Sequence, residues 1–205
     1  MSIPDLRAEH RRAAEATIEV VSRLTHDDLS RPTPCADWNL GDLLAHMIVQ
    51  NHGFAAAAEG GGADPAIWKV GPLGADPMAD HTAATEHVMT AFAADGVLDQ
   101  PFFLAELTDQ PLPATQAISF HFVDCVVHGW DVARSVGQPW KLDADLLHAA
   151  LPVAEAVPDS DFRTLPGASF RPRLPSTPAD DPLDRILRLL GRSPAWPGEA
   201  PTPGL

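Results

Sequence analysis

The sequence predicts an all-α fold. In several segments the apolar residues recur at about the 3.6-residue period of a helix, and stretches rich in proline and glycine separate these segments. No segment shows a convincing apolar–polar alternation of the kind that indicates a half-buried strand. With 205 residues the chain is long enough for one domain with a substantial core. We therefore expect five or six helices and no strand.

The first two predicted helices cover residues 5–24 and 40–58. Pro4 suits the first turn of the first helix, because a backbone N–H has no helical partner there in any case. A proline-rich turn separates the two helices, and Asp37 or Asn39 can cap the second one. Three consecutive glycines then end the second helix.

The remaining helices lie between longer irregular stretches. We expect loops over 60–78 and 97–112, a length that is often found in lids and binding loops. Further helices are predicted over 80–94, 114–136, 143–157 and 183–190. Because 11 of the 21 prolines follow residue 150, the chain divides into a helical body, residues 1–157, and a proline-rich extension, residues 158–205, with a short helix packed on the body.

Composition excludes several classes of partner. Asp and Glu outnumber Lys and Arg by 28 to 14, and the resulting net charge of −14 repels nucleic acids and anionic membrane surfaces. We therefore expect no nucleic-acid partner and no membrane partner. No segment approaches the roughly 20 apolar residues that span a bilayer. The N-terminal residues lack the pattern of a secretory signal, so the expected location is cytoplasmic, where Cys35 and Cys125 remain thiols.

A narrow polar stripe crosses the fourth predicted helix. At 100° per residue, His121, Asp124, His128 and Asp131 lie within about 80° of one another. The rest of this helix is apolar, as in a central helix whose polar groups need partners inside the protein. Asp124 and His128 are one turn apart, which is the spacing at which a helix offers two ligands to one ion. The alternative is a stripe that simply faces water.

Other polar residues are open to two interpretations. His46 shares a face of the second helix with Asp42 and Gln50, and by itself this pattern favours a histidine on the helix surface. Cys35 lies in a turn without a base nearby in the sequence, so we expect packing rather than nucleophilic chemistry. We expect Trp130 in the core, beside an Asp131 that anchors either Arg134 or a histidine. The sequence lacks the motifs of zincin proteases, of serine hydrolases with a nucleophile elbow, and of P-loop enzymes.

Three separated motifs resemble the N-terminal, metal-binding domain of the mycothiol-dependent maleylpyruvate isomerase family, in its actinobacterial branch of the DinB-like superfamily. The first motif combines residues 33–38, TPCADW, with residues 42–46, DLLAH. The second is residues 124–134, DCVVHGWDVAR, and the third is residues 184–194, DRILRLLGRSP. The resemblance extends over nearly the whole chain.

This resemblance implies an up-down-down-up four-helix bundle, residues 1–157, with a divalent metal, usually zinc, near one end. Carried onto this chain, the ligands are His46, Asp124 and His128. His121 is then a supporting neighbour or an alternative ligand, and Cys35, Trp130 and Asp131 surround the site. The second motif of the family has Glu where this chain has Asp124, whose side chain is one methylene shorter.

Two imidazoles and one carboxylate leave a coordination position open on a divalent ion, which lowers the pKa of a bound water or thiol. The resemblance therefore implies a metal-dependent thiol S-transferase that uses mycothiol and a small electrophile, with the loops 60–78 and 97–112 around its pocket. Isomerase activity itself is not expected, because the tail has no counterpart of the isomerase's separate C-terminal domain. A non-catalytic binding protein and an iron oxygenase remain alternatives, as do a monomer and a homodimer.

Overall fold

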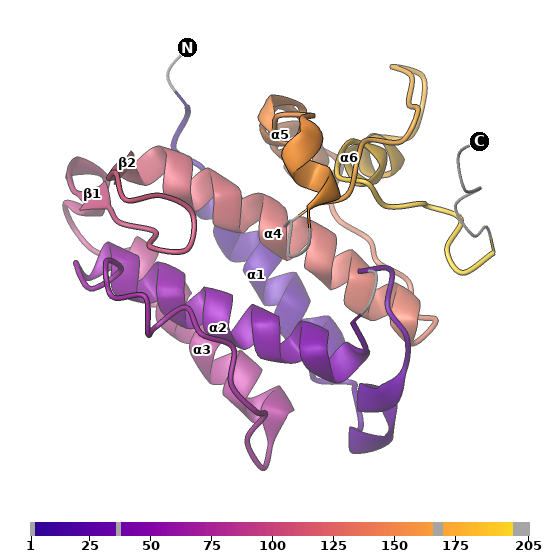
Figure 1. Ribbon diagram of the computed structural model, residues 1–205, viewed down its shortest axis with the longest axis horizontal. Coiled ribbons are helices and arrows are strands. Elements are labelled where there is room, and N and C mark those ends of the chain that lie inside the picture. Colours follow the sequence, from indigo (N-terminus) through magenta and orange to yellow (C-terminus); the bar gives the residue numbers. More distant parts are fainter. Residues whose placement is uncertain (1–2, 36–37, 166–169, 199–205) are drawn as a thin grey trace.

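Six α-helices make up most of the part of the chain that the computed structural model describes, residues 3–35, 38–165 and 170–198 (Figure 1). Short 3-10 turns lie in three of the connections. None of the described helices is both long and apolar enough to cross a membrane. The helices are α1 (Arg7–Val21), α2 (Leu40–Ala58), α3 (Pro77–Phe92), α4 (Ala114–Ser135), α5 (Ala144–Ala156) and α6 (Pro182–Leu189).

The first four helices form an up-down-down-up bundle, as predicted. In Figure 1, α1 and α4 run in one direction, whereas α2 and α3 run in the other, and the connection between α2 and α3 returns along the bundle. α1 packs against α3 and α4, and α2 packs against the same two helices. One side of α2 therefore faces α4, the helix that carries the polar stripe.

Capping side chains set where the helices begin. Of the two predicted caps of α2, Asn39 accepts a hydrogen bond from the backbone N–H of Asp42, whose carboxylate accepts one from Asn39 in return. The other predicted cap, Asp37, lies outside the described residues. α3 begins three residues earlier than predicted, because Asp76 caps it and Pro77 occupies a first-turn position that tolerates proline.

The prediction that the chain has no strand is wrong at one place. Pro101–Phe102 (β1) and Leu112–Pro113 (β2) form a short antiparallel pair in the connection between α3 and α4. Two residues are too few to show alternation, and each strand contains a proline, which normally argues against a strand. The pair fixes Phe102 in the core, with its ring centroid 6.0 Å from that of Phe92.

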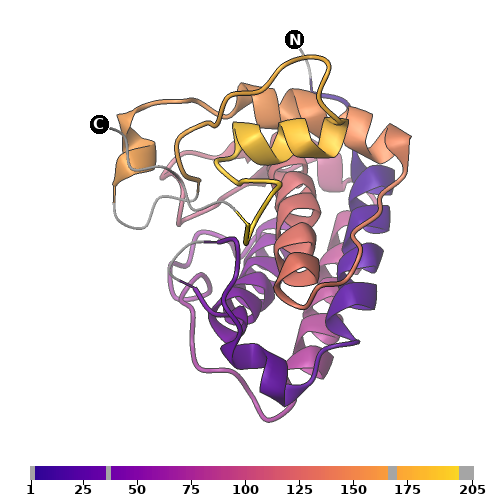
Figure 2. The ribbon, with the colours of Figure 1, turned by 90° about the vertical axis from the view of Figure 1, so that its right-hand side faces the viewer.

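α5 and α6 pack against each other and lie across α4, outside the four-helix bundle (Figure 2). Between them, the buried Arg163 donates hydrogen bonds to the backbone carbonyls of Pro158, Arg171 and Leu189 and so ties the segment before α6 to the end of that helix. The apolar cluster that joins α5 and α6 to α4 includes Val123, Val126, Leu147, Ala150, Ile186 and Leu190.

The glycine at position 129 gives a testable prediction about packing around α4. A Cβ atom at Gly129 would overlap the ring of Trp140, which lies directly on this glycine. Gly129→Ala should therefore lower the free energy of unfolding by about 1–3 kcal/mol, the cost of overpacking, although alanine is the better helix former. Urea unfolding tests this, and Gly129→Ala combined with Trp140→Leu should recover part of the loss. A Gly129→Ala variant as stable as the unsubstituted protein would contradict the packing described.

The buried His81 on α3 should make the free energy of unfolding depend on pH. Its ring is completely buried, and neither ring nitrogen has a hydrogen-bond partner among the described residues. Burial, with a smaller contribution from the charge of His121, lowers the pKa of His81 from 6.5 to about 4. Between these values the unfolded chain binds a proton that the folded chain does not, so stability falls as the pH falls from about 6.5 towards 4.

Replacing His81 with leucine should remove this part of the acid sensitivity. At pH 5 the effect of His81 on the free energy of unfolding is about 2 kcal/mol, whereas above pH 7 it vanishes. Urea unfolding at pH 7.5 and pH 5 measures the difference. His148→Leu, which removes an exposed imidazole from α5, is the control. An equal loss of stability at pH 5 in His81→Leu and in the unsubstituted protein would refute the prediction.

Candidate metal centre

α2 and α4 bring the three predicted ligands together. His46 lies on α2, and Asp124 and His128 lie one turn apart on the facing side of α4. One candidate ligand atom from each residue lies within 4.8 Å of the other two. The imidazole centroids of His46 and His128 are 5.1 Å apart, and Nε2 of His128 is 3.3 Å from Oδ1 of Asp124. The three side chains therefore offer two nitrogens and one oxygen to a common point.

Asp131 fixes the orientation of His128. The Nδ1 atom of His128 is 2.9 Å from Oδ2 of the buried Asp131. Since a carboxylate can only accept a hydrogen bond, Nδ1 of His128 is the donor and carries the proton. Nε2 then faces Asp124 and His46, which is the arrangement by which a carboxylate prepares a histidine for a metal ion. Of the two partners predicted for Asp131, a histidine and Arg134, the structure places the histidine there.

Arg192 holds Asp131 in turn. Nε of Arg192 lies 3.0 Å from both carboxylate oxygens of Asp131, and Nη2 lies 2.9 Å from Oδ2. Both side chains are at least 95% buried. Gly191, with φ of +77°, ends α6 with a left-handed turn, after which Arg192 reaches back to α4. The C-terminal segment thus supplies a positive charge that holds Asp131, and through it His128, in place.

The protonation of the trio follows from its surroundings. Burial lowers the pKa of His46 to about 4, and the charge of His128 acts in the same direction, so this imidazole is neutral. Burial also opposes a charge on His128, but Asp124 and Asp131 outweigh it and raise the pKa of His128 to about 9. Burial raises the pKa of Asp124, but His128 and His46 together have the larger, opposite effect. The pKa of Asp124 is therefore lowered, and this carboxyl is ionised. Two carboxylates therefore favour a positive charge at this point.

The residues fit a divalent metal ion. Imidazole nitrogen and carboxylate oxygen are ordinary zinc ligands, and three protein ligands leave a position open, as in catalytic sites. The carboxylate next to His128 supplies the supporting hydrogen bond that metal-ligating histidines usually have. Asp124 is partly exposed, with 22% of its side chain accessible, so an ion and a small ligand can reach it from solvent.

A pocket of about 800 Å³ adjoins His46. Its walls come from the first turns of α2, from the 3-10 turn His26–Ser30 and from residues 70–73, so part of the predicted binding loop 60–78 does line it. The ring centroid of Trp38 lies 4.9 Å from that of His46, and both residues line the pocket. A small molecule in this pocket would therefore lie next to one of the candidate ligands.

The other predicted loop, residues 97–112, places Glu106 against α2. Its Oε2 accepts a hydrogen bond of 2.9 Å from the amide of Gln50, which lies one turn after His46 on α2. Burial raises the pKa of Glu106, the hydrogen bond from Gln50 opposes this effect, and the charge of Asp124 adds to it. No sequence motif marks Glu106, because its place depends on how the loop folds over α2.

His121 lies apart from this trio. Its Nδ1 pairs with His10 of α1 at 2.7 Å and lies 3.9 Å from the sulfur of Cys125. No hydrogen bond joins it to His46 or His128 in the described part of the chain. The buried Cys125 is packed in the apolar core.

Cys35 and Trp130 lie next to the centre, and the sulfur of Cys35, a ring nitrogen of His128 and a carboxylate oxygen of Asp131 lie within 4.8 Å of one another. The sulfur of Cys35 is 3.7 Å from Nη2 of Arg192, and burial raises the pKa of this thiol to about 11. Trp130 is buried, and the guanidinium of Arg134 lies 5.7 Å from its ring centroid. Arg134 also donates to the carbonyls of two residues near the C-terminal end of the described chain.

Sequence reasoning missed two residues with clear contacts here. Arg192 lies in the third motif, but its pairing with Asp131 spans 61 residues and has no local signal. His10 occupies the apolar side of α1 at helical spacing from Leu6 and Ala13, all three being buried. A histidine inside an apolar stripe is a recognisable sign of an interior polar partner, and this sign was available in the sequence.

Known proteins resemble this chain in sequence and in fold. Residues 10–133 match the family model of the mycothiol maleylpyruvate isomerase N-terminal domain. Two uncharacterized proteins of Mycobacterium tuberculosis, from strains CDC 1551 and H37Rv, are each 29% identical over 189 residues, which is 90% of this chain and 96% of theirs. The crystal structure of the mycothiol-dependent maleylpyruvate isomerase aligns with a TM-score of 0.59 at 12% identity, over 80% of this chain and 72% of that one.

Proposed function

The chain belongs to the mycothiol maleylpyruvate isomerase N-terminal domain family, and on this basis we propose that it is a divalent-metal-dependent enzyme that joins a mycothiol-type thiol to a small electrophile. The observation that carries the proposal is the convergence of His46, Asp124 and His128 beside a pocket that His46 itself lines. A metal-binding site with an open coordination position next to a pocket is typical of a catalytic centre.

In this proposal His46, Asp124 and His128 hold the ion, and zinc is the ion that best suits two imidazoles and one carboxylate. When bound, the ion acts as a Lewis acid: it lowers the pKa of a thiol and so makes it a nucleophile at neutral pH. Asp131 keeps the proton of His128 on Nδ1, and Arg192 keeps Asp131 ionised and in place.

The division of the chain also belongs to the proposal. Residues 1–157 form the metal-binding body, and residues 158–205 form an extension that completes the site by supplying Arg192. The pocket beside His46 and Trp38 then receives the thiol or its electrophilic partner. The support for a thiol of the mycothiol class is the family to which the chain belongs.

Turnover is the test of this function. Zinc-loaded protein is mixed with mycothiol and an activated haloarene, an epoxide or an α,β-unsaturated carbonyl compound, and the thioether product is measured by mass spectrometry. The proposal expects at least one adduct to form faster than without protein, and this acceleration to disappear in His46→Ala. If no electrophile reacts above the uncatalysed rate, the proposal is wrong and the chain is a non-catalytic binding protein of the same fold.

A further inference from the structure

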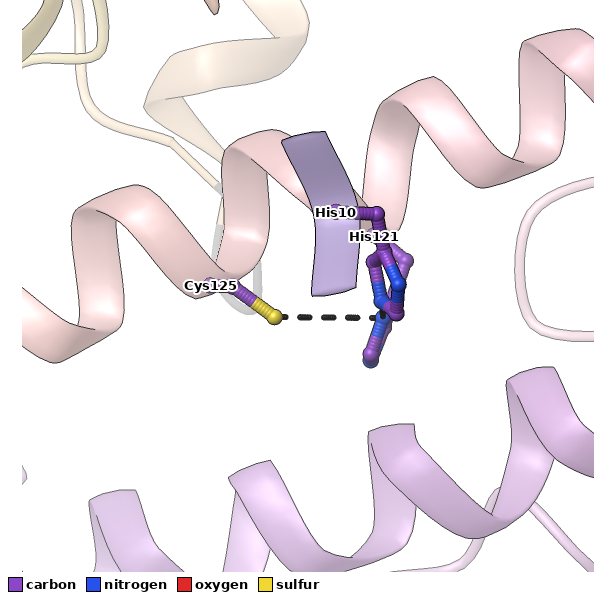
Figure 3. Close-up of side chains that lie close together, drawn as sticks. All are labelled: His10, His121 and Cys125. Atoms are coloured by element: carbon purple, nitrogen blue, oxygen red, sulfur yellow. Dashed lines mark hydrogen bonds between the residues drawn. The ribbon is translucent and has the colours of Figure 1, made fainter. Parts of the chain in front are cut away.

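A second group of metal-ligating side chains lies deep inside the bundle, between α1 and α4. It consists of His10, His121 and Cys125 (Figure 3). Nε2 of His10 is 2.7 Å from Nδ1 of His121, and the sulfur of Cys125 is 3.9 Å from the same Nδ1. The three candidate ligand atoms all lie within 4.8 Å of one another. This group shares no residue with the trio of His46, Asp124 and His128.

The surroundings of this group are apolar. His10 and His121 are each 1% exposed and Cys125 is 6% exposed. The rings of Phe92 and Phe54 pack against the two imidazoles, at centroid distances of 4.7 Å from His10 and 4.6 Å from His121, respectively. Two imidazoles and a thiol at one point of such a core are unusual, since apolar side chains fill this kind of space at lower cost.

The distances are close to those of a coordination site. Metal–nitrogen bonds of about 2.0 Å and metal–sulfur bonds of about 2.3 Å place neighbouring ligand atoms about 3.3–3.8 Å apart. The sulfur of Cys125 already lies 3.9 Å from Nδ1 of His121. The two imidazole nitrogens are closer than this, because they share a hydrogen bond. A separation of the rings by less than about 1 Å is therefore enough to admit an ion.

We propose that His10, His121 and Cys125 form a binding site for a soft monovalent metal ion of the Cu(I) class. Thiolate and imidazole ligands suit soft ions. Two neutral imidazoles and one thiolate carry a charge of −1, so a monovalent ion leaves the site neutral, whereas a divalent ion leaves a buried positive charge. On binding, the proton of the Cys125 thiol is released to solvent. The proton in the hydrogen bond between the two rings moves to the other nitrogen of the ring that carries it, so both imidazoles stay neutral.

The structure also offers a route from the surface to this site. A pocket of about 370 Å³ lies between the start of α1 and the end of α3, and His10 lines it. Met89 lines the same pocket, and its thioether is a further soft group on the way to the interior. The pocket thus brings solvent close to His10, one of the three proposed ligands.

Competition for Cu(I) tests this inference. Reduced, metal-free protein is titrated anaerobically into the Cu(I) complex of bicinchoninate, whose colour is lost when the protein takes up the ion. The unsubstituted protein should withdraw one equivalent, and so should Cys35→Ser and His46→Ala, which alter the other centre. Cys125→Ser and His121→Asn should lose this uptake. The inference is wrong if the unsubstituted protein takes up no Cu(I), or if Cys125→Ser takes up as much as Cys35→Ser.

A structural measurement guards against variants that fail to fold. X-ray absorption of the copper-loaded, unsubstituted protein should show one sulfur and two nitrogen ligands, and coordination without sulfur would overturn the site. The inference does not depend on the proposed function, because the two centres share no ligand, and His46→Ala should lose zinc and keep its Cu(I) uptake. Failure of Cu(I) binding would leave His10 and His121 as a purely structural hydrogen-bonded pair.

Discussion

Replacing either His46 or His128 with alanine is expected to remove a stoichiometric divalent metal ion from the protein. Each substitution leaves only two of the three proposed ligands, and an ion held by two side chains exchanges readily with solvent. The measurement is metal analysis of protein purified without a histidine tag. Because an ion that binds the folded state adds to its stability, a chelator should lower the melting temperature of the unsubstituted protein and have no such effect on the two variants.

The matched control for these variants is His148→Ala, which removes an exposed histidine from α5, away from the metal centre. This variant should keep both the ion and the effect of the chelator. A protein that purifies without metal and takes up none on addition of zinc would contradict the assignment. So would an unchanged metal content in both His46→Ala and His128→Ala.

Arg192→Met is expected to be the most destabilising single substitution near the site, with a loss of about 3–5 kcal/mol, the usual cost of removing one partner of a buried ion pair. Methionine fills most of the space of the arginine stem but leaves the carboxylate of Asp131 buried without its cation. His128 then loses a firmly held partner, so we expect weaker metal binding as well. Urea unfolding and metal analysis of the same preparation measure both effects.

Two further variants separate the charge effect from general damage. Arg11→Met removes an exposed arginine whose ion pair with Glu15 is worth less than about 1 kcal/mol, and it should change little. Arg192→Met combined with Asp131→Asn removes the unpaired charge and should recover part of the lost stability. A loss below about 1 kcal/mol in Arg192→Met would show that Asp131 does not depend on this cation.

The fold could be predicted from the sequence because its information is local. Helical periodicity and helix-ending residues gave α2 its observed limits, 40–58, and the other five helices to within about three residues. The start of α3 was placed too late, because Pro77 marks a loop as readily as a first helical turn. The short pair β1 and β2 could not be predicted, since its pairing depends on the closure of a loop and not on alternation.

The same distinction applies to the candidate site: contacts along one helix could be predicted from the sequence, whereas contacts between distant segments could not. The spacing of Asp124, His128 and Asp131 along one helix was visible in the sequence, and their common stripe predicted that they would lie together. Nothing local links His46 to that stripe, and only the family resemblance did so. The contact of Arg192 with Asp131 and that of His10 with His121 arise from packing between distant segments, which the sequence pattern alone does not encode.

Anomalous diffraction at the zinc absorption edge is the most direct test of the metal centre. Crystals of the zinc-loaded protein should show one strong peak within about 2.0–2.2 Å of an imidazole nitrogen of His46, Nε2 of His128 and a carboxylate oxygen of Asp124. Crystals of His46→Ala should lack it. Zinc-loaded crystals without a peak between α2 and α4, or with the strong peak only at other residues, would contradict the account of this site.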